Sequence, residues 1–258
     1  RGRGAAVVAA GCGQPVAERA ADRGGLRLLG NALIENSTIS SNQSTGWYGG
    51  ALFLTDGILE MVTSTVVDNL SPSFAPAAVF VGTFGPSSAT LNLVNSVVAR
   101  NVTEGCFLAP FGSGTVAINS LGNNVFTDAT CNPAASDQVV ADPLIGPLQD
   151  NGGPTETHEL LPGSPAVDAG DDGACPPTDQ RGITRPQGSV DDIGAYEASC
   201  PAFPASVANE AELNTAIRCY NGQTVAGSYT ISVTQNISLT ASTTTINNAT
   251  SGVALVIE

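Results

Sequence analysis

The sequence predicts an all-β protein in which a parallel β-helix (β-solenoid) is followed by a loop-rich module and one short capping helix. The first observation is a repeat: ALIENSTISSN, LEMVTSTVVDN and LNLVNSVVARN align at Ser37, Ser64 and Ser96, with offsets of 27 and 32 residues. This period is that of one coil of a solenoid. The second is the composition, with 29 Gly, 5% aromatic residues and many Thr, Ser, Asn, Val and Ile. It favours short strands joined by tight turns.

Each coil has a second strand upstream of the aligned serine. These strands begin GGLRLL at Gly24, GGALFL at Gly49 and PAAVFV at Pro76. We expect residues 1–140 to form the coils, the fourth being a degraded coil around TVAINSLGNNVF. Because side chains alternate between the faces of a strand, alternate Val and Ile residues are expected to fill the solenoid bore.

Polar residues recur where the strands end. In ENSTISSN, alternation places Ser37, Ile39 and Ser41 on one face and Thr38 and Ser40 on the other. The recurring asparagines predict a ladder stacked from coil to coil, formed by Asn42, Asn69 and Asn101. N-glycosylation tripeptides also occur, and a repeat rich in Ser, Thr and Asn produces them by composition; they begin at Asn36, Asn42, Asn69, Asn101, Asn236 and Asn248.

Residues 141–199 are dense in Pro and Gly and lose the period, so loops and short strands packed on the solenoid are expected there. The submotifs ADPLIGPLQDNGGPT, LLPGSPAVDAG, TDQRG, RPQG and DIGAYE follow one another in this segment. In this order they resemble the choice-of-anchor Q module that ends many bacterial right-handed parallel β-helix proteins of the cell exterior. The resemblance implies right-handed coils, secretion and surface display, and it brings no shared catalytic activity.

Residues 200–258 contain the one convincing helix, VANEAELNTAIRC. Asn209 can cap it, Glu210 and Glu212 fall in its first turn, and Leu213 and Ile217 share a face. Short β segments follow. In relatives of the resembled family, similar sequence opens a fresh β-helix whose first coil is capped by the helix. We therefore expect this segment to start a second solenoid or to be donated to a neighbouring subunit.

Six cysteines fit an oxidising compartment. Spacing predicts the pair Cys106–Cys131, which flanks a loop, and the pair Cys200–Cys219, which flanks the helix. None of the six has CxxC or Cys/His spacing, which argues against a zinc site.

The resemblance bears on the remaining two cysteines. Relatives of the module carry a second Cys just before the DIGAYE stretch, where this chain has Val190 and Asp191. Cys175 has thus lost its usual partner, and Cys12 is the remaining candidate.

The best metal-like feature is the turn DAGDDG. Asp168, Asp171 and Asp172 are the candidate calcium ligands, because Ca²⁺ takes six to eight oxygen atoms. The segment fails as an EF-hand, since its third position is Gly170. The favoured interpretation is that Asp168 and Asp192 cap turns and pair with Arg181 or Arg185. No other cofactor is expected.

A polysaccharide-binding or -cleaving enzyme is the alternative, because pectin lyases and polygalacturonases also use right-handed β-helices. The coils carry Arg27 and Arg100, but their carboxylates Asp56, Glu60 and Asp68 are scattered. The only His, His158, lies in the module, in a stretch that family resemblance assigns to packing. Trp47 and Tyr48 fall in a turn where aromatic rings can stack on sugars. Catalysis is therefore not predicted.

The net charge of −14 argues against binding nucleic acid or anionic lipid, and no apolar run reaches the length of a membrane span. The sequence opens without Met and closes on the strand-like SGVALVIE, so both ends are expected to be cuts through a longer polypeptide. The sequence predicts a non-catalytic, secreted bacterial surface protein with a structural or adhesive role. Its expected partners are copies of itself in a head-to-tail filament or a longer parent chain, with surface glycans as further candidates.

Overall fold

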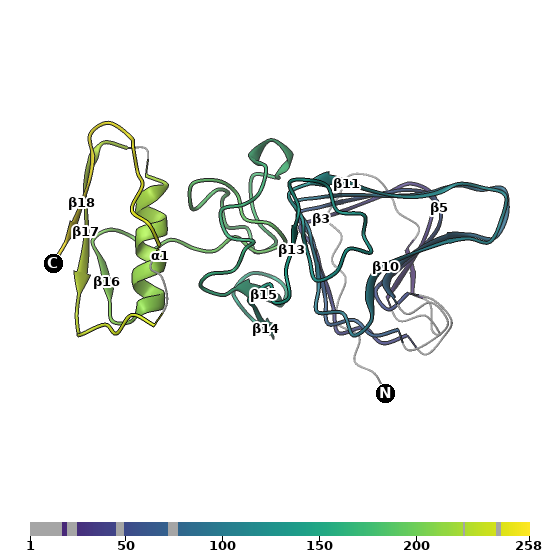
Figure 1. Cartoon of the computed structure of the whole chain (residues 1–258), viewed down its shortest axis with the longest axis horizontal. Coiled ribbons are helices and arrows are strands. Elements are labelled where there is room, and N and C mark those ends of the chain that lie inside the picture. Colours follow the sequence, from purple (N-terminus) through teal and green to yellow (C-terminus); the bar gives the residue numbers. More distant parts are fainter. Residues whose placement is uncertain (1–16, 20–24, 45–48, 72–76, 224, 241–243) are drawn as a thin grey trace.

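The computed structural model describes residues 17–19, 25–44, 49–71, 77–223, 225–240 and 244–258. Three parts follow one another along the longest axis of the molecule (Figure 1): a block of stacked coils up to residue 140, a loop-rich module, and a part with one helix and three strands. Five residues named in the sequence analysis lie outside the described residues: Cys12, Gly24, Trp47, Tyr48 and Pro76. What was predicted for them stays a prediction.

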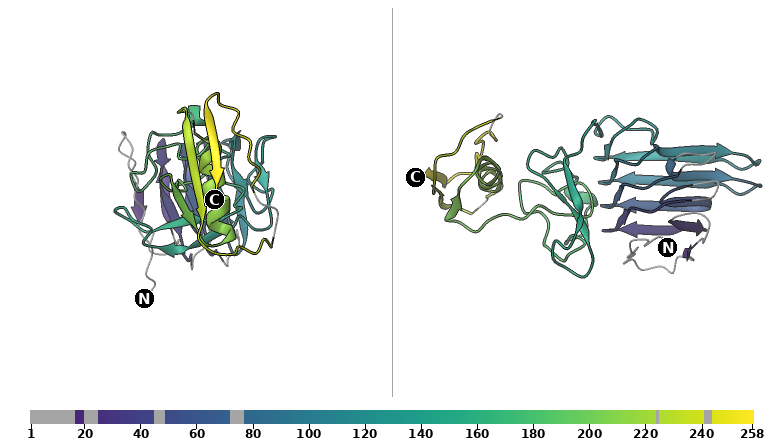
Figure 2. Two further views of the ribbon diagram at one scale, coloured as in Figure 1. Left: turned by 90° about the vertical axis from the view of Figure 1, so that its left-hand side faces the viewer. Right: turned by 90° about the horizontal axis from the view of Figure 1, so that it is seen from below.

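The coil block is a parallel β-solenoid, and its coils are seen stacked in the right-hand view of Figure 2. Its strands form an eight-stranded and a five-stranded sheet, and only β1 with β2 is antiparallel. The eight-stranded sheet contains β1 (Ala17–Arg19), β2 (Leu26–Leu29), β3 (Ala32–Glu35), β5 (Leu52–Val62), β7 (Ala77–Thr83), β8 (Ala89–Val94), β10 (Glu104–Pro110) and β11 (Val116–Gly122). The five-stranded sheet contains β4 (Thr38–Ser40), β6 (Thr65–Val67), β9 (Val97–Ala99), β12 (Val125–Phe126) and β13 (Gln138–Val139).

The predicted register is confirmed. Thr38 pairs with Thr65, and Thr65 pairs with Val97, which reproduces the offsets of 27 and 32 residues between the aligned serines. Gly57 turns β5 from one side of the coil to the next with φ +83°, and a Cβ there would lie 2.3 Å from the Gly30 carbonyl carbon. Only glycine tolerates both the conformation and this close approach.

Buried apolar side chains fill the bore, as alternation predicts. The five-stranded sheet supplies Ile39, Val66, Val98 and Phe126, and the eight-stranded sheet supplies Leu54, Met61 and Leu93. Each such side chain stabilises the fold by about 1.5–3 kcal/mol relative to exposure. The prediction that Ser41 shares the inward face is wrong, because β4 ends at Ser40 and Ser41 is exposed with φ +57°.

The asparagine ladder is confirmed. Asn69 Oδ1 accepts from the backbone N and the Nδ2 of Asn42, and Asn101 Oδ1 accepts in the same way from Asn69. Asn42 and Asn69 are 5% and 0% exposed, so their amides are committed to the ladder and closed to glycosylation.

A second ladder runs through the aligned serines. The backbone N of Ser37 donates to Ser64 Oγ, Ser64 N donates to Ser96 Oγ, and Ser96 N donates to Asn124 Oδ1. Asp137 ends it, because its Oδ1 accepts from both the N and the Nδ2 of Asn124.

The end of the coil block beside β10 is closed by residues 127–137. Asp128 Oδ2 accepts from Gly105 N, and Thr130 Oγ1 accepts from Cys106 N. The disulfide between Cys106 and Cys131 fixes this segment over the core, with Cys131 fully buried. The segment thus satisfies backbone groups that would otherwise form an open sheet edge.

The module has little regular structure, as its Pro and Gly content predicts. It contains the antiparallel pair β14 (Ile145–Gln149) and β15 (Thr157–Leu160) and one 3₁₀ turn, Asp172–Ala174. It covers the five-stranded sheet from the side, where Ile145, Ala166 and Ile193 form one apolar cluster with Val97 and Val125. That sheet is therefore buried on both faces.

The C-terminal part contains the predicted helix, α1 (Glu210–Asn221), with Asn209 Oδ1 accepting from Glu212 N at its start. Its strands β16 (Ala205–Val207), β17 (Gly227–Val233) and β18 (Val253–Ile257) form one parallel sheet. Ile217 is buried against this sheet and Leu213 packs beside it. No helix in the described residues is long and apolar enough to cross a membrane.

Candidate functional site

Every coil makes a hydrogen bond with the module. In the first coil Thr38 Oγ1 donates to Gln180 Oε1 at 2.7 Å, and in the second Thr65 Oγ1 accepts from Ala195 N at 3.0 Å. The third and fourth coils contribute Asn95 Nδ2 to Asp171 O and Asn123 Nδ2 to Ala169 O, both at 2.9 Å. The module is thereby tied to the whole height of the coil stack.

One corner of each coil has left-handed backbone. The residues there are Asn36, Thr63, Asn95 and Asn123, with φ between 43° and 53°. Asn is the non-glycine residue that adopts this conformation most readily. Sequence reasoning missed Asn36, Asn95 and Asn123 as module contacts, although each directly precedes a member of the serine ladder.

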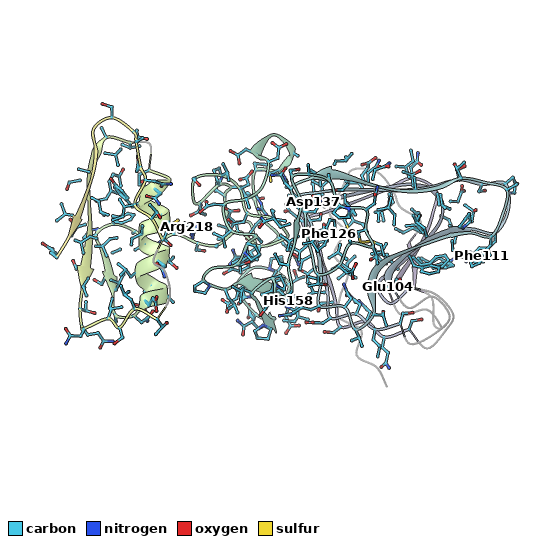
Figure 3. All side chains as sticks on the ribbon, in the orientation of Figure 1. Glu104, Phe111, Phe126, Asp137, His158 and Arg218 are labelled. Atoms are coloured by element: carbon cyan, nitrogen blue, oxygen red, sulfur yellow. A yellow bond between two sulfur atoms is a disulfide. The ribbon has the colours of Figure 1, made fainter. Side chains whose placement is uncertain are left out.

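His158, labelled in Figure 3, joins the module to the first coil. Its Nδ1 lies 2.8 Å from the carbonyl oxygen of Gly146, and its Nε2 lies 2.8 Å from Ser40 Oγ. A carbonyl only accepts, so Nδ1 carries the proton and Nε2 accepts from the serine. Burial lowers the pKa of His158 and keeps the ring neutral. This geometry agrees with the packing role expected for His158.

An arginine on the third coil forms a second attachment. Arg100 pairs with Asp68 on the neighbouring coil at 2.7 Å and donates to the carbonyl oxygens of Ile145 and Gly146 in the module. In the sequence the carboxylates of the coils are scattered, but the 32-residue step between neighbouring coils brings Asp68 beside Arg100. The pair holds β14 against the coils.

The three candidate calcium ligands bind backbone groups of the module. Asp168 Oδ1 accepts from Ser189 N, Asp171 Oδ1 from Gly173 N, and Asp172 Oδ1 from Asp191 N. Within the described ranges, no group of three or more His, Cys, Asp or Glu side chains is placed to hold a metal ion. Each of these carboxylates thus accepts from a backbone N–H, a role that the favoured sequence interpretation gave to Asp168 and Asp192.

The arginine partners differ from that interpretation. Arg181 pairs with Asp179 at 2.7 Å, and Arg185 pairs with Glu197 at 2.8 Å. Asp168 instead faces Arg218 of α1 at 3.6 Å. The interpretation chose Asp168 and Asp192 as carboxylates near the arginines in sequence, but the partners are Asp179, two residues from Arg181, and Glu197, twelve residues from Arg185.

Asp192 and Glu197 form a buried carboxylate pair. The side chain of Asp192 accepts from the backbone N of Asp168 and from that of Ala198. Its own backbone N donates to Glu197 Oε2. Burial raises the pKa of Asp192 to about 6 and that of Glu197 to about 7. The second cause for Glu197 is the charge of Asp192.

Both spacing-based cysteine pairs are confirmed. Cys106–Cys131 and Cys200–Cys219 are disulfides with Cα separations of 5.0 and 5.5 Å. Cys175 is a half-buried free thiol whose Sγ accepts from Asn95 Nδ2. Burial raises the pKa of the Cys175 thiol, so it stays protonated.

Exposed aromatic rings lie at the tip of the coil block. Phe84 and Phe111 are 53% and 50% exposed and stack with ring centroids 5.5 Å apart; Figure 3 labels Phe111 at this tip. Behind them Phe53, Phe80 and Phe107 continue the stack. The sequence pointed to Trp47 and Tyr48 as the aromatic pair. Phe84 and Phe111 were missed because they lie in turns outside the aligned repeats, although Phe53 and Phe80 lie in the repeated strands β5 and β7.

A cleft of about 380 Å³ lies where the module meets α1. Leu161, Val167 and Tyr196 line it from the module, and Asn214 and Arg218 line it from the helix. Arg218, labelled in Figure 3, donates to the carbonyl oxygens of Ala198 and Ser199. The guanidinium therefore fastens the C-terminal part to the module.

Comparisons with the models of known protein families, with the curated proteins and with the solved structures find no match for this chain.

Proposed function

We propose that the chain belongs to a secreted bacterial surface protein in which the β-solenoid has a structural or adhesive role and no catalytic one. In this proposal residues 141–199 are a choice-of-anchor Q-like module. The partners are further copies of the chain or the remainder of a longer parent chain, with surface glycans as adhesion ligands.

One observation carries the structural role. His158 and Arg100, two side chains suited to acid, base or electrostatic chemistry, are engaged in holding the coils and the module together. His158 bonds Ser40 and Gly146, and Arg100 bonds Asp68 and the β14 carbonyl groups. Groups fixed in this way support a rigid shaft.

The disulfides support the extracellular location. Both close short loops at structural junctions, one over the end of the coils and the other at α1. Disulfides persist in oxidising compartments and are rare in the cytosol. With the surface charge of an acidic chain, they suit a protein that stays soluble outside the cell.

The location is tested on intact cells of the source organism with an antibody against the chain. We expect protease treatment of intact cells to remove the antibody signal, and non-reducing gels to retain both disulfides. A signal that survives until the cells are lysed would overturn the surface location.

The non-catalytic role is tested with the purified chain on neutral and acidic polysaccharides, including polygalacturonate with and without Ca²⁺. We expect binding to a subset and cleavage of none. Cleavage that is lost in Asp68→Asn but kept in Asp142→Asn, an exposed module residue, would replace this proposal with the enzyme alternative.

A further inference from the structure

A cleft lies between the module and the polar face of α1. Leu213 and Ile217 turn one face of the helix toward its own sheet, and Figures 1 and 2 show α1 between that sheet and the module. Asn214, Thr215 and Arg218 line the module side of the helix, in the cleft of about 380 Å³. This volume lies in the range of small-molecule sites, roughly 300–1,000 Å³.

The cleft continues along the helix. A second cleft of about 460 Å³ is lined by Pro201 and Ala211, and it shares Pro162, Ser199 and Thr215 with the first. We call the two clefts together the junction groove. Because the groove is elongated, it suits a chain molecule better than a single small ring.

Covalent and polar contacts fix the walls of the junction groove. The disulfide between Cys200 and Cys219 ties α1 to the segment that leaves the module, and Arg218 donates to two carbonyl oxygens of the module. On the module wall the guanidinium carbon of Arg181 lies 3.5 Å from the centre of the Tyr196 ring and holds that ring in place. Since the walls are already ordered, little entropy is lost in shaping them around a ligand.

The two walls differ in polarity. The module wall offers apolar and aromatic surface from Val167 and Tyr196, whereas the helix wall offers amide and hydroxyl groups from Asn214 and Thr215. Asn214 Oδ1 accepts from Thr244 N at 2.7 Å. Within the described residues, neither Asn214 Nδ2 nor the Thr215 hydroxyl has a hydrogen-bond partner in the protein. Both polar groups are therefore available to a ligand.

The charge of the junction groove disfavours an acidic ligand. Among the described residues that line it, Arg218 is the one cation, and its guanidinium faces Asp168 at 3.6 Å. Glu212 adds a second carboxylate farther along the helix. One positive charge against two negative ones leaves a net charge of −1 on the groove, in a chain that carries −14. A polyanion is repelled, and a neutral ligand is favoured.

We propose that the junction groove binds a neutral hexose oligosaccharide. A pyranose ring has C–H groups on its faces and hydroxyl groups around its rim. The faces pack on Val167 and Tyr196, and the hydroxyls, which both donate and accept, bond Asn214 and Thr215. A peptide backbone instead pairs with a strand edge, whereas the wall that carries the open polar groups is a helix. This inference rests on the adhesive role proposed above, for which it names the ligand class and the site.

Titration of the full chain with cellohexaose, mannohexaose and galactohexaose, followed by amide NMR spectra and calorimetry, tests the site. We expect at least one of these neutral hexamers to shift the amide signals of Asn214, Thr215 and Tyr196, and hexagalacturonate to shift none. Thr215→Val keeps the shape of the side chain and removes its hydroxyl, so the dissociation constant should rise about three- to tenfold. Thr215→Met places a longer apolar side chain where the two clefts meet, so the rise should be at least about tenfold.

Thr90→Val is the matched control, because it removes the same hydroxyl from a half-buried position of β8 on the coil block. It is expected to bind like the wild type, and circular dichroism verifies that all variants are folded. Unchanged binding in Thr215→Val and Thr215→Met overturns the groove as the site and leaves the adhesive role standing. A wild-type chain that binds none of the neutral hexamers, or that binds hexagalacturonate instead, overturns the neutral ligand; the surface location is decided separately by protease treatment of intact cells.

Discussion

Removing one amide from the asparagine ladder tests how much the ladder stabilises the coils. Asn69 is fully buried and makes bonds in both directions along the stack. Its Oδ1 accepts twice from Asn42, and its Nδ2 donates to the carbonyl oxygens of Ile39 and Val67 and to Asn101 Oδ1. Asn69→Ala removes all five bonds and leaves their partner groups in place.

The magnitude follows from those stranded groups. Each buried donor or acceptor left without a partner costs about 1–3 kcal/mol, and the bonds share atoms, so they do not add fully. The Asn42 backbone N–H loses its acceptor, while Asn42 Nδ2 still donates to Ser40 O and Val67 O still accepts from Ser41 N. With the weakened bonds of these groups added, we expect Asn69→Ala to lower the free energy of unfolding by about 2–4 kcal/mol.

Chemical denaturation followed by circular dichroism measures this loss. Asn119→Ala is the control, since Asn119 donates to Asn92 in a ladder on the exposed outer face. There water replaces the lost bond, and the expected cost is below about 1 kcal/mol. Equal costs for Asn69→Ala and Asn119→Ala would refute the reasoning that burial makes the inner ladder strong.

Three further predictions concern a corner, a disulfide and a carboxylate pair. Thr63→Asn is expected to stabilise the coils by about 1 kcal/mol in the same assay, because φ +43° is unfavourable for a β-branched residue and the equivalent corners carry Asn; a loss of stability would contradict this. Replacing Cys106 and Cys131 together by Ala is expected to cost about 3 kcal/mol for the 25-residue separation that the disulfide closes, and limited proteolysis should then cut first within 127–137. Because the pKa values of Asp192 and Glu197 are raised in the folded state, the protonated pair stabilises the fold at a pH below the ordinary carboxyl pKa. This contribution is lost as the pH rises through about 6–7. Stability should therefore fall between pH 5 and pH 8, and the fall should be smaller in Glu197→Gln; an unchanged pH profile in that variant would exclude Glu197 as its source.

The periodic features of the fold could be predicted because they are local. A coil step of 27 or 32 residues, the asparagine ladder and α1 with its Asn209 cap depend on spacing and on residue type, which the sequence displays directly. The two disulfides followed because each joins cysteines that flank one short element.

The module could not be predicted to the same depth. Its contacts join residues far apart in the chain, such as Asn36 with Thr178 and Ser40 with His158. With no period to fix its path, the sequence did not show which of several nearby carboxylates each arginine binds. Arg218 shows the limit most clearly, since its carboxylate Asp168 belongs to a different part of the molecule.

Alternation along the five-stranded sheet explains how the module is held. The inward residues are apolar in all four coils, whereas the outward residues change from Thr38 in the first coil to Thr65, Val97 and Val125 in the later coils. The module matches this change from polar to apolar residues along the stack. It offers Gln180 and His158 to the first coil, and Ile145, Ala166 and Ile193 to the later ones.

Hydrogen bonds fix direction and apolar contacts supply most of the stabilisation. The hydrogen bonds with the first coil therefore set the position of the module, and the apolar contacts with the later coils hold it in place. A one-residue slip in any coil would exchange the bore and module faces. The same alternation that fills the solenoid therefore also specifies where the module attaches.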